Sequence, residues 1–248
     1  MSFGLEVSGQ LAAGASGTQG GTVGIWFHLR RRRFDSMHRT LFLAAAVLLT
    51  LAGCRKADVE QHVATAPVAA TPEITEKKAE ALEQNAAAGN TTVPPAEVIK
   101  RPEAQALDPT GKEPLDDALT CLARTVYWEA RGDSEISMEA IANVVMNRLG
   151  HDGFPDTVCG VVKQGHEQGL CQFSWWCDGR SDSAFEEDPY KVSKEIARRA
   201  LNLQLTDATG GALYFHHRDV NPNWAPQYLK TVEIGKFAFY KPRDGEAR

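Results

Sequence analysis

Three stretches in the C-terminal half of the chain carry apolar residues at intervals of three and four positions, the spacing of one helix face. The first covers residues 116–132, where Gly132 is expected to end the helix, and the second covers residues 136–149. The third covers residues 188–203, where Asp188-Pro189 supplies a cap followed by proline at the first helical position. These patterns predict three consecutive helices.

Beyond the third helix the pattern changes from helical spacing to alternation. Gly210-Gly211 interrupts the chain, and residues 212–216 then read as a strand. A hairpin is expected to pair residues 231–234 with residues 237–240. Helices followed by strands within one short region predict an α+β domain that is rich in helix and ends in a β-hairpin or small sheet.

Aromatic residues locate the folded part of the chain. All 5 Tyr, 4 of the 5 Trp and 6 of the 10 Phe follow Leu115, and none lies between Arg55 and Leu115. We therefore expect one folded domain over residues 116–242 and a short tail over 243–248. Residues 54–115, rich in Ala, Pro and Glu, are expected to be a disordered tether with at most a short helix near residues 73–84.

The N-terminal residues 1–53 read as an extension followed by an export signal. A short basic start at Met37 precedes an 11-residue apolar run, which is too short to span a bilayer comfortably. Leu51-Ala52-Gly53-Cys54 resembles the lipobox of bacterial lipoproteins, which implies a lipid anchor on Cys54. The residue after this cysteine is Arg55 and not the Asp that is associated with retention at the inner membrane, so we expect attachment at the periplasmic side of the outer membrane. Because the signal is complete from Met37 onward, we expect Met37 to be the true start.

Cysteine number and charge narrow the class of protein further. With Cys54 lipidated, four cysteines remain, which favours two disulfides in an exported domain. Three pairings are possible, and we favour Cys171 with Cys177, which enclose a tight loop, and Cys121 with Cys159. A zinc site is the weaker alternative because Cys-x-x-Cys spacing is absent. Residues 116–248 hold 15 basic and 20 acidic side chains, which argues against nucleic acid as a partner.

Glu129 is the residue whose surroundings suggest chemistry. It lies beside Tyr127 and Trp128 near a predicted helix end, where partial desolvation raises the pKa of a carboxyl group. A carboxylic acid that stays protonated near neutral pH can protonate the leaving oxygen of a glycosidic bond. The alternative is a structural carboxylate paired with Arg124 or Arg131.

Several short motifs follow one another in this region: Val126-Tyr127-Trp128-Glu129-Ala130-Arg131-Gly132-Asp133, Ala140-Ile141-Ala142-Asn143-Val144-Val145-Met146-Asn147-Arg148-Leu149, Phe154-Pro155-Asp156-Thr157 with Val161-Val162, Cys171-Gln172-Phe173-Ser174, Gly210-Gly211-Ala212-Leu213-Tyr214-Phe215 and Ile234-Gly235-Lys236-Phe237-Ala238-Phe239-Tyr240. In this order they resemble the cell wall hydrolase family typified by spore cortex-lytic SleB. The resemblance covers nearly all of residues 119–241.

This resemblance implies a lysozyme-like fold and cleavage of peptidoglycan between N-acetylmuramic acid and N-acetylglucosamine by lytic transglycosylase chemistry. It places the catalytic acid and base on Glu129. The family usually has Glu where this chain has Asp133, which we expect to be structural. A muramidase that uses Asp133 or Asp178 to activate water, and an envelope lipoprotein that binds glycan without cutting it, stay open as alternatives. The family's specificity for spore cortex is not carried over.

Substrate contacts are expected from two further segments. The loop between Cys171 and Cys177 supplies Gln172, Ser174, Trp175 and Trp176, although one Trp there could pack in the core instead. In the first strand, Tyr214 and His216 share one face, and the resemblance places Tyr214 in the site. Asn147 and Arg148 are expected to stabilise a helix end. We predict no metal and no cofactor, and the sequence does not define the oligomeric state.

Overall fold

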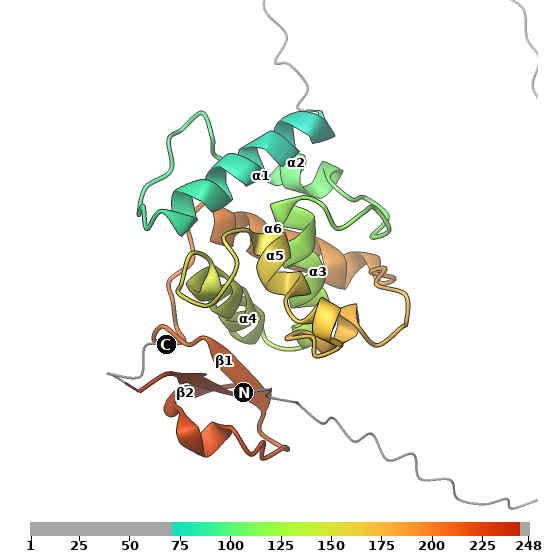
Figure 1. Cartoon of the computed structure of the whole chain (residues 1–248). Coiled ribbons are helices and arrows are strands. Elements are labelled where there is room, and N and C mark those ends of the chain that lie inside the picture. The colour runs from blue at the N-terminus through green and yellow to red at the C-terminus, as the bar shows by residue number, and fades with distance from the viewer. Residues whose placement is uncertain (1–70, 244–248) are drawn as a thin grey trace, which may run out of the picture. The chain divides into compact units, whose positions relative to one another are not determined.

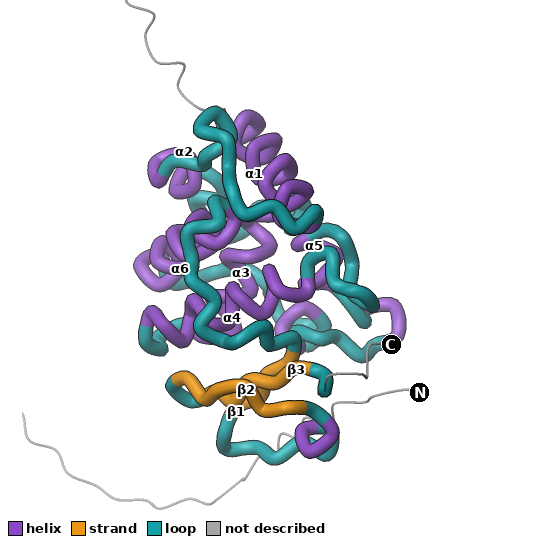
Figure 2. Tube along the Cα trace, turned by 90° about the vertical axis from the view of Figure 1, so that its left-hand side faces the viewer, coloured by secondary structure: helices purple, strands orange, loops and turns teal. Residues whose placement is uncertain are grey.

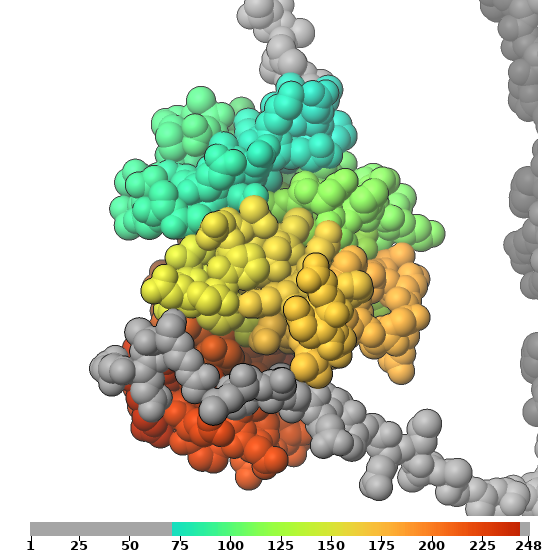
Figure 3. All heavy atoms as spheres, in the orientation of Figure 1, coloured from blue at the N-terminus to red at the C-terminus, as the bar shows by residue number. Residues whose placement is uncertain are grey.

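The computed structural model describes residues 71–243. Its helices and strands follow in this order: α1 Pro72–Ala87, α2 Arg101–Ala106, α3 Ala118–Ala130, α4 Glu135–Arg148, α5 Val158–Lys163, the 3-10 turns η1 His166–Gln168 and η2 Ser174–Trp176, α6 Glu187–Leu201, β1 Tyr214–His217, the 3-10 turn η3 Ala225–Gln227, β2 Leu229–Ile234 and β3 Phe237–Lys241. The helices form one body with the sheet at one end, and α1 and α2 lie at the opposite end (Figures 1, 2 and 3). The expected α+β class, rich in helix with a C-terminal hairpin, is confirmed.

The central helix of this body is α3, which packs against α1, α4, α5 and α6. Its residues from Ala118 to Tyr127 are all buried, as expected of a helix that is apolar on nearly every face. The Asp117 carboxylate caps its first turn by accepting a hydrogen bond from the Thr120 amide at 2.9 Å. Gly132, whose φ is +81°, follows its last turn and allows the chain to reverse into α4.

The predicted helices are confirmed with their ends moved by one or two residues. The helix expected over residues 188–203 is α6, Glu187–Leu201, whose buried face includes Tyr190, Ile196 and Leu201. The short helix α5 was not predicted, because its six residues are too few to show helical spacing. The buried faces of α4, α5 and α6 all cover α3, and this arrangement makes one continuous core.

The C-terminal sheet has three antiparallel strands in the order β1–β3–β2. Tyr214 of β1 pairs with Tyr240 of β3. Because successive side chains of a strand point to opposite faces, odd-numbered and even-numbered positions lie on opposite sides of the sheet. Phe215, Phe237 and Phe239 point into the main core. At the β2–β3 turn, Gly235 has a φ of +55°, and a Cβ there would lie 2.3 Å from the Ser137 hydroxyl of α4. This close approach fixes the sheet against the N-terminal end of α4.

The prediction of a disordered tether over residues 54–115 is wrong for residues 71–115. Helix α1 buries Ala79 and Leu82 completely, and Ile99 in the following segment is also fully buried. The Asn202 amide exchanges two hydrogen bonds with the backbone of Ile99, at 3.0 and 2.8 Å. Aliphatic side chains are therefore enough to hold this segment in place without aromatic residues, because they pack onto a core that α3 and α6 already provide. Residues 54–70 lie outside the described residues.

A buried ion pair fixes this N-terminal segment to the helices. Asp108 and Arg124 are 0% and 2% exposed, and the Arg124 Nη2 lies 2.6 Å from the Asp108 Oδ2. Tyr190 of α6 donates to the same oxygen at 2.6 Å. Burial opposes ionisation of Asp108, but hydrogen bonds from Tyr190, the Glu113 amide and Arg124 outweigh it and lower its pKa. Residues 108–113 are thus an integral part of the domain.

Both favoured disulfides are present. Cys121–Cys159 joins α3 to α5, and Cys171–Cys177 closes the loop that contains η2. The export signal, the lipidation site Cys54 and residues 244–248 lie outside the described residues. Within residues 71–243, no helix has the length and apolar character needed to cross a membrane.

Candidate active site

Glu129 lies in the last turn of α3. Its side chain is half-buried, so the carboxyl group keeps some contact with solvent. Protein atoms nevertheless surround it closely enough that burial raises its pKa to about 7, although the positive charge of Arg148 lowers it in part. A group of this kind is still substantially protonated at neutral pH, as a general acid must be.

The charge that acts on Glu129 comes from Arg148 at the end of α4. Arg148 is 3% exposed, and its guanidinium lies 5.2 Å from the ring centres of Phe154 and Phe173 and 5.8 Å from that of Tyr214. Its Nε donates to the Leu213 carbonyl at 2.7 Å, while Nη1 has no hydrogen-bond partner among the described residues. Burial lowers the pKa of Arg148 to about 10, opposed by Tyr214 and Glu129.

Arg148 joins the end of α4 to the Leu213 carbonyl, as expected, and its charge in addition acts on Glu129. Asn147 joins the end of α4 to the segment before β1, since its amide donates to the Ala212 carbonyl at 3.1 Å and to the Thr209 hydroxyl at 3.2 Å. A sequence signal for Arg148 existed: it falls four residues after Val144 and seven after Ile141, on the apolar face of its helix. A charged residue on such a face is buried only where something nearby balances its charge.

The two arginines considered as partners for Glu129 bind other carboxylates. Arg124 pairs with Asp108, and Arg131 lies 2.8 Å from Glu186. Asp133 is held by Lys236 of the β2–β3 turn at 2.9 Å, which agrees with a structural role. Among the described residues, Arg148 is thus the charged group that shifts the pKa of Glu129.

The residues that precede Glu129 in α3 are held by the loop before α6. Trp128 donates its indole N–H to the Asp182 carbonyl at 3.1 Å, and Arg124 donates to the same oxygen at 2.7 Å. Tyr127 donates to Glu186 at 3.2 Å. Phe185, which is 64% exposed, packs edge-on against Trp128. These contacts fix the last turn of α3 and leave an exposed aromatic ring beside it.

The loop between Cys171 and Cys177 supplies fewer solvent-facing groups than expected. Trp175 is only 6% exposed and belongs to the core, so the expectation that it binds substrate is corrected. Trp176 and Gln172 are half-buried and Ser174 is exposed. Trp176 packs against His166, and the Lys163 ammonium lies 5.2 Å from its ring centre. Roles for Gln172, Ser174 and Trp176 in binding stay predictions.

Tyr214 and His216 share one face of the sheet, as the alternation predicted, while Phe215 lies on the other face, against the core. His216 is hydrogen-bonded to the Tyr240 hydroxyl at 2.9 Å and stacks on its ring. Tyr214 lies closer to the candidate site, because its ring approaches the Arg148 guanidinium. Within residues 71–243 no group of three His, Cys, Asp or Glu side chains is placed to hold a metal ion.

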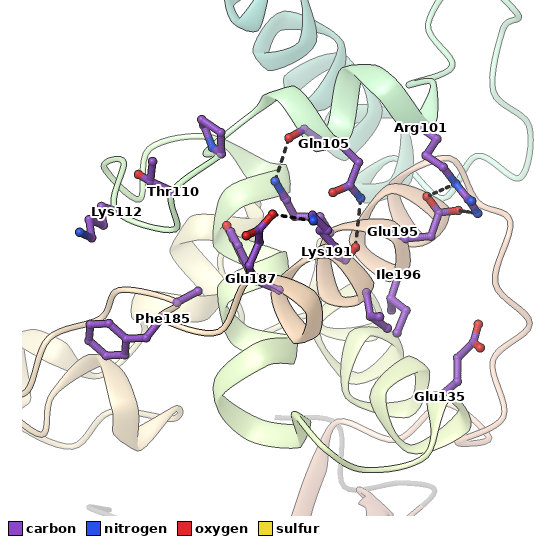
Figure 4. A pocket seen from close by; sticks show the side chains of 15 residues that line it. Arg101, Gln105, Thr110, Lys112, Glu135, Phe185, Glu187, Lys191, Glu195 and Ile196 are labelled. Carbon is purple, nitrogen blue, oxygen red and sulfur yellow. Dashed lines mark hydrogen bonds and ion pairs between the residues drawn. The ribbon is translucent and has the colours of Figure 1, made fainter. Parts of the chain in front are cut away.

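A groove of about 980 Å³ lies along α6 and the loop after α2. Figure 4 shows two ion pairs among its lining residues, Arg101 with Glu195 and Lys191 with Glu187. Glu129 is not among its lining residues. A second cavity, of about 800 Å³, is lined by Phe154 and Tyr214, two of the rings around Arg148. Glu129 and Arg148 do not line this cavity either, but the two rings place its wall next to the guanidinium of Arg148.

Comparison with known proteins identifies the family of this chain. Residues 132–240 match the family model described as Cell Wall Hydrolase. The spore cortex-lytic enzyme of Halalkalibacterium halodurans is 32% identical over 127 residues, which is 50% of this chain and 34% of that protein. The chain belongs to the cell wall hydrolase family.

A second relative in this family is the spore cortex-lytic enzyme of Bacillus subtilis, 31% identical over 148 residues, or 58% of this chain and 44% of that protein. The chain therefore spans less than half the length of either curated relative. The solved catalytic domain of the germination-specific lytic transglycosylase SleB from Bacillus anthracis is 30% identical, with a TM-score of 0.42, and the match covers 50% of this chain and 93% of that domain. The family model begins just after Glu129, so it does not itself assign that residue.

Proposed function

We propose that this protein cleaves the glycan strands of peptidoglycan between N-acetylmuramic acid and N-acetylglucosamine, with Glu129 as the acid and base. The observation that carries the proposal is the setting of Glu129: a half-buried carboxyl group whose pKa is about 7, with the cation of Arg148 acting on it. Membership of the cell wall hydrolase family and the cortex-lytic relatives support peptidoglycan as the substrate.

In the first step, the protonated Glu129 donates its proton to the glycosidic oxygen while the bond from that oxygen to the muramic C1 breaks. The leaving N-acetylglucosamine takes the bonding electrons and the proton. Glu129 becomes a carboxylate, and the positive charge of Arg148 stabilises it in the low-dielectric surroundings of the site. The positive charge of Arg148 thus favours the conversion of the Glu129 carboxylic acid to a carboxylate.

In the second step, the Glu129 carboxylate removes the proton from the C6 hydroxyl of the same muramic acid. The C6 oxygen then bonds to C1 and closes a 1,6-anhydro ring, so that Glu129 returns to its protonated form. The nucleophile belongs to the substrate, and its proximity replaces a bound water. This lytic transglycosylase route needs no second carboxylate.

The surroundings of Glu129 favour this route over a muramidase that activates water. A water-using enzyme needs a carboxylate free to act as base, whereas Asp133 is paired with Lys236 and Glu186 with Arg131. Asp178 accepts a hydrogen bond from the Arg180 amide within its own exposed loop. Among the described residues, Arg148 is the charged group that changes the pKa of Glu129.

The test is muropeptide analysis after digestion of purified sacculi by the full-length protein. We expect 1,6-anhydro products with the wild type and none with Glu129→Gln. Asp133→Asn is the matched control, because it removes a neighbouring carboxylate that the proposal leaves without a catalytic part. Products heavier by one water would indicate a muramidase, and binding to sacculi without any released product would indicate a binding protein.

We also propose that Cys54 carries the lipid that anchors the protein, on the periplasmic side of the outer membrane. Because residues 71–115 belong to the folded domain, only residues 55–70 separate the anchor from it, a reach of at most about 55 Å. Labelling with a fatty-acid probe should mark the wild type and spare Cys54→Ser. Equal labelling of the two would contradict the anchor.

A further inference from the structure

The second cavity is built from four short segments around the start of β1. They are residues 150–154 after α4, residues 213–214, residues 227–228 and residues 242–243, and they enclose about 800 Å³. Cavities of this volume commonly bind small molecules or short stretches of polymer. We name it the Tyr228 cavity after the aromatic ring that lies at its wall.

The Tyr228 cavity shares a wall with the candidate active site. The rings of Phe154 and Tyr214 line the cavity, and the guanidinium of Arg148 lies 5.2 and 5.8 Å from their centres. Arg148 in turn acts electrostatically on Glu129. The aromatic rings of Phe154 and Tyr214 therefore separate the cavity from the charge on Arg148.

The lining of the cavity combines aromatic walls with charged groups at an exposed rim. Tyr214 and Tyr228 lie with ring centres 4.6 Å apart. Arg243 is exposed and anchored, since its Nη2 donates to the carbonyls of Pro226 and Tyr228 at 3.2 Å each. A guanidinium has five N–H donors, and these two bonds use one nitrogen, which leaves capacity for an anion.

A negative charge is also present at the exposed rim of the cavity, on Asp152. A neutral sugar requires neither charge, whereas a peptide with free carboxylates and an amino group can use both. The substrate of the proposed reaction carries such a peptide, since stem peptides with acidic and diamino residues are attached to the muramic acid through its lactyl group. This chemistry distinguishes the peptide stem from the bare glycan as the ligand.

We infer that the Tyr228 cavity binds the peptide stem of the muramic acid at the cleavage site, with Arg243 recognising a stem carboxylate and Tyr214 and Tyr228 covering its apolar parts. This inference rests on the proposed peptidoglycan-cleaving function. It makes the enzyme selective for glycan strands that still carry stems. Strands from which an amidase has removed the stems would leave the cavity empty.

The experiment compares two substrates, intact glycan strands with stems and the same strands after amidase treatment, and measures anhydro products by mass spectrometry. The wild type should have the lower KM for strands with stems. Arg243→Gln should raise that KM about tenfold, the usual size of a lost charge-assisted hydrogen bond, and leave kcat and the stripped strands unaffected. Arg101→Gln removes an exposed arginine from the groove of Figure 4 and should alter neither substrate.

Each alternative outcome has a defined meaning. If Arg243→Gln weakens cleavage of both substrates equally, the cavity binds the glycan itself, and if it affects neither, the stem does not bind there; both results overturn the inference. Unchanged thermal unfolding of Arg243→Gln would exclude misfolding as the cause. If Glu129→Gln still cleaves either substrate at the wild-type rate, the proposed function fails, which is a separate result.

Discussion

Replacing Glu129 by Gln should make the protein more stable at alkaline pH while removing its activity. The wild-type carboxyl group is desolvated, and burial raises its pKa from 4.5 to about 7. Holding the ionised form in that place therefore costs folding free energy. Glutamine has nearly the same shape and carries no charge at any pH, so the substitution removes this cost.

The magnitude follows from the pKa of the folded protein. At about 1.4 kcal/mol for each tenfold change in proton affinity, a rise from 4.5 to about 7 corresponds to roughly 3 kcal/mol. Since Glu129 keeps some solvent contact, we expect about 2–3 kcal/mol. For a domain of this size, this corresponds to an increase in Tm of about 5–10 °C.

The sign of the pH dependence is defined by linkage. Below pH 4.5 the group is protonated in both the folded and the unfolded chain and contributes nothing. Between pH 4.5 and about 7 the folded state retains a proton that the unfolded state has lost, so this group makes the wild type less stable as the pH rises. Above about pH 7 the whole cost is present. The advantage of Glu129→Gln should therefore be absent at pH 4 and complete at pH 8.5.

The assay is thermal and urea unfolding of wild type and variant at pH 4 and pH 8.5. Glu167→Gln serves as the control, because Glu167 is exposed and its substitution removes the same charge from an acidic chain. That control should change the free energy of unfolding by less than about 0.5 kcal/mol at either pH. If Glu129→Gln gives the same difference from wild type at both pH values, the carboxyl group is not desolvated and the reasoning is refuted.

Three further predictions concern other contacts. Arg148→Gln should shift the alkaline limb of the pH–activity profile upward, because Arg148 lowers the pKa of Glu129; an unshifted limb would exclude this coupling. Asp108→Ala should cost about 3–5 kcal/mol in urea unfolding, since it leaves the buried Arg124 unpaired, and a loss below about 1 kcal/mol would contradict the network. Removal of residues 1–115 should lower Tm sharply compared with removal of residues 1–70, and equal Tm values would show that α1 and α2 add no stability.

Local sequence determined much of the fold and part of the candidate site. Helical spacing located α3, α4 and α6 within one or two residues, because the face of a helix that is buried must be apolar at each turn. Alternation located β1 and the hairpin, and an even number of cysteines indicated two disulfides. Glu129 could be selected from its aromatic neighbours and the motif around it.

Other features depended on segments that are far apart in the chain. Residues 71–115 lack aromatic side chains and have no core of their own, yet they fold because α3 and α6 offer a surface for Leu82 and Ile99. In the same way, only the packed structure distinguishes the buried Trp175 from Trp176 and brings Arg148 to Glu129. Burial and electrostatic fields are set by all surrounding atoms, whereas a sequence pattern records only the neighbours along one element.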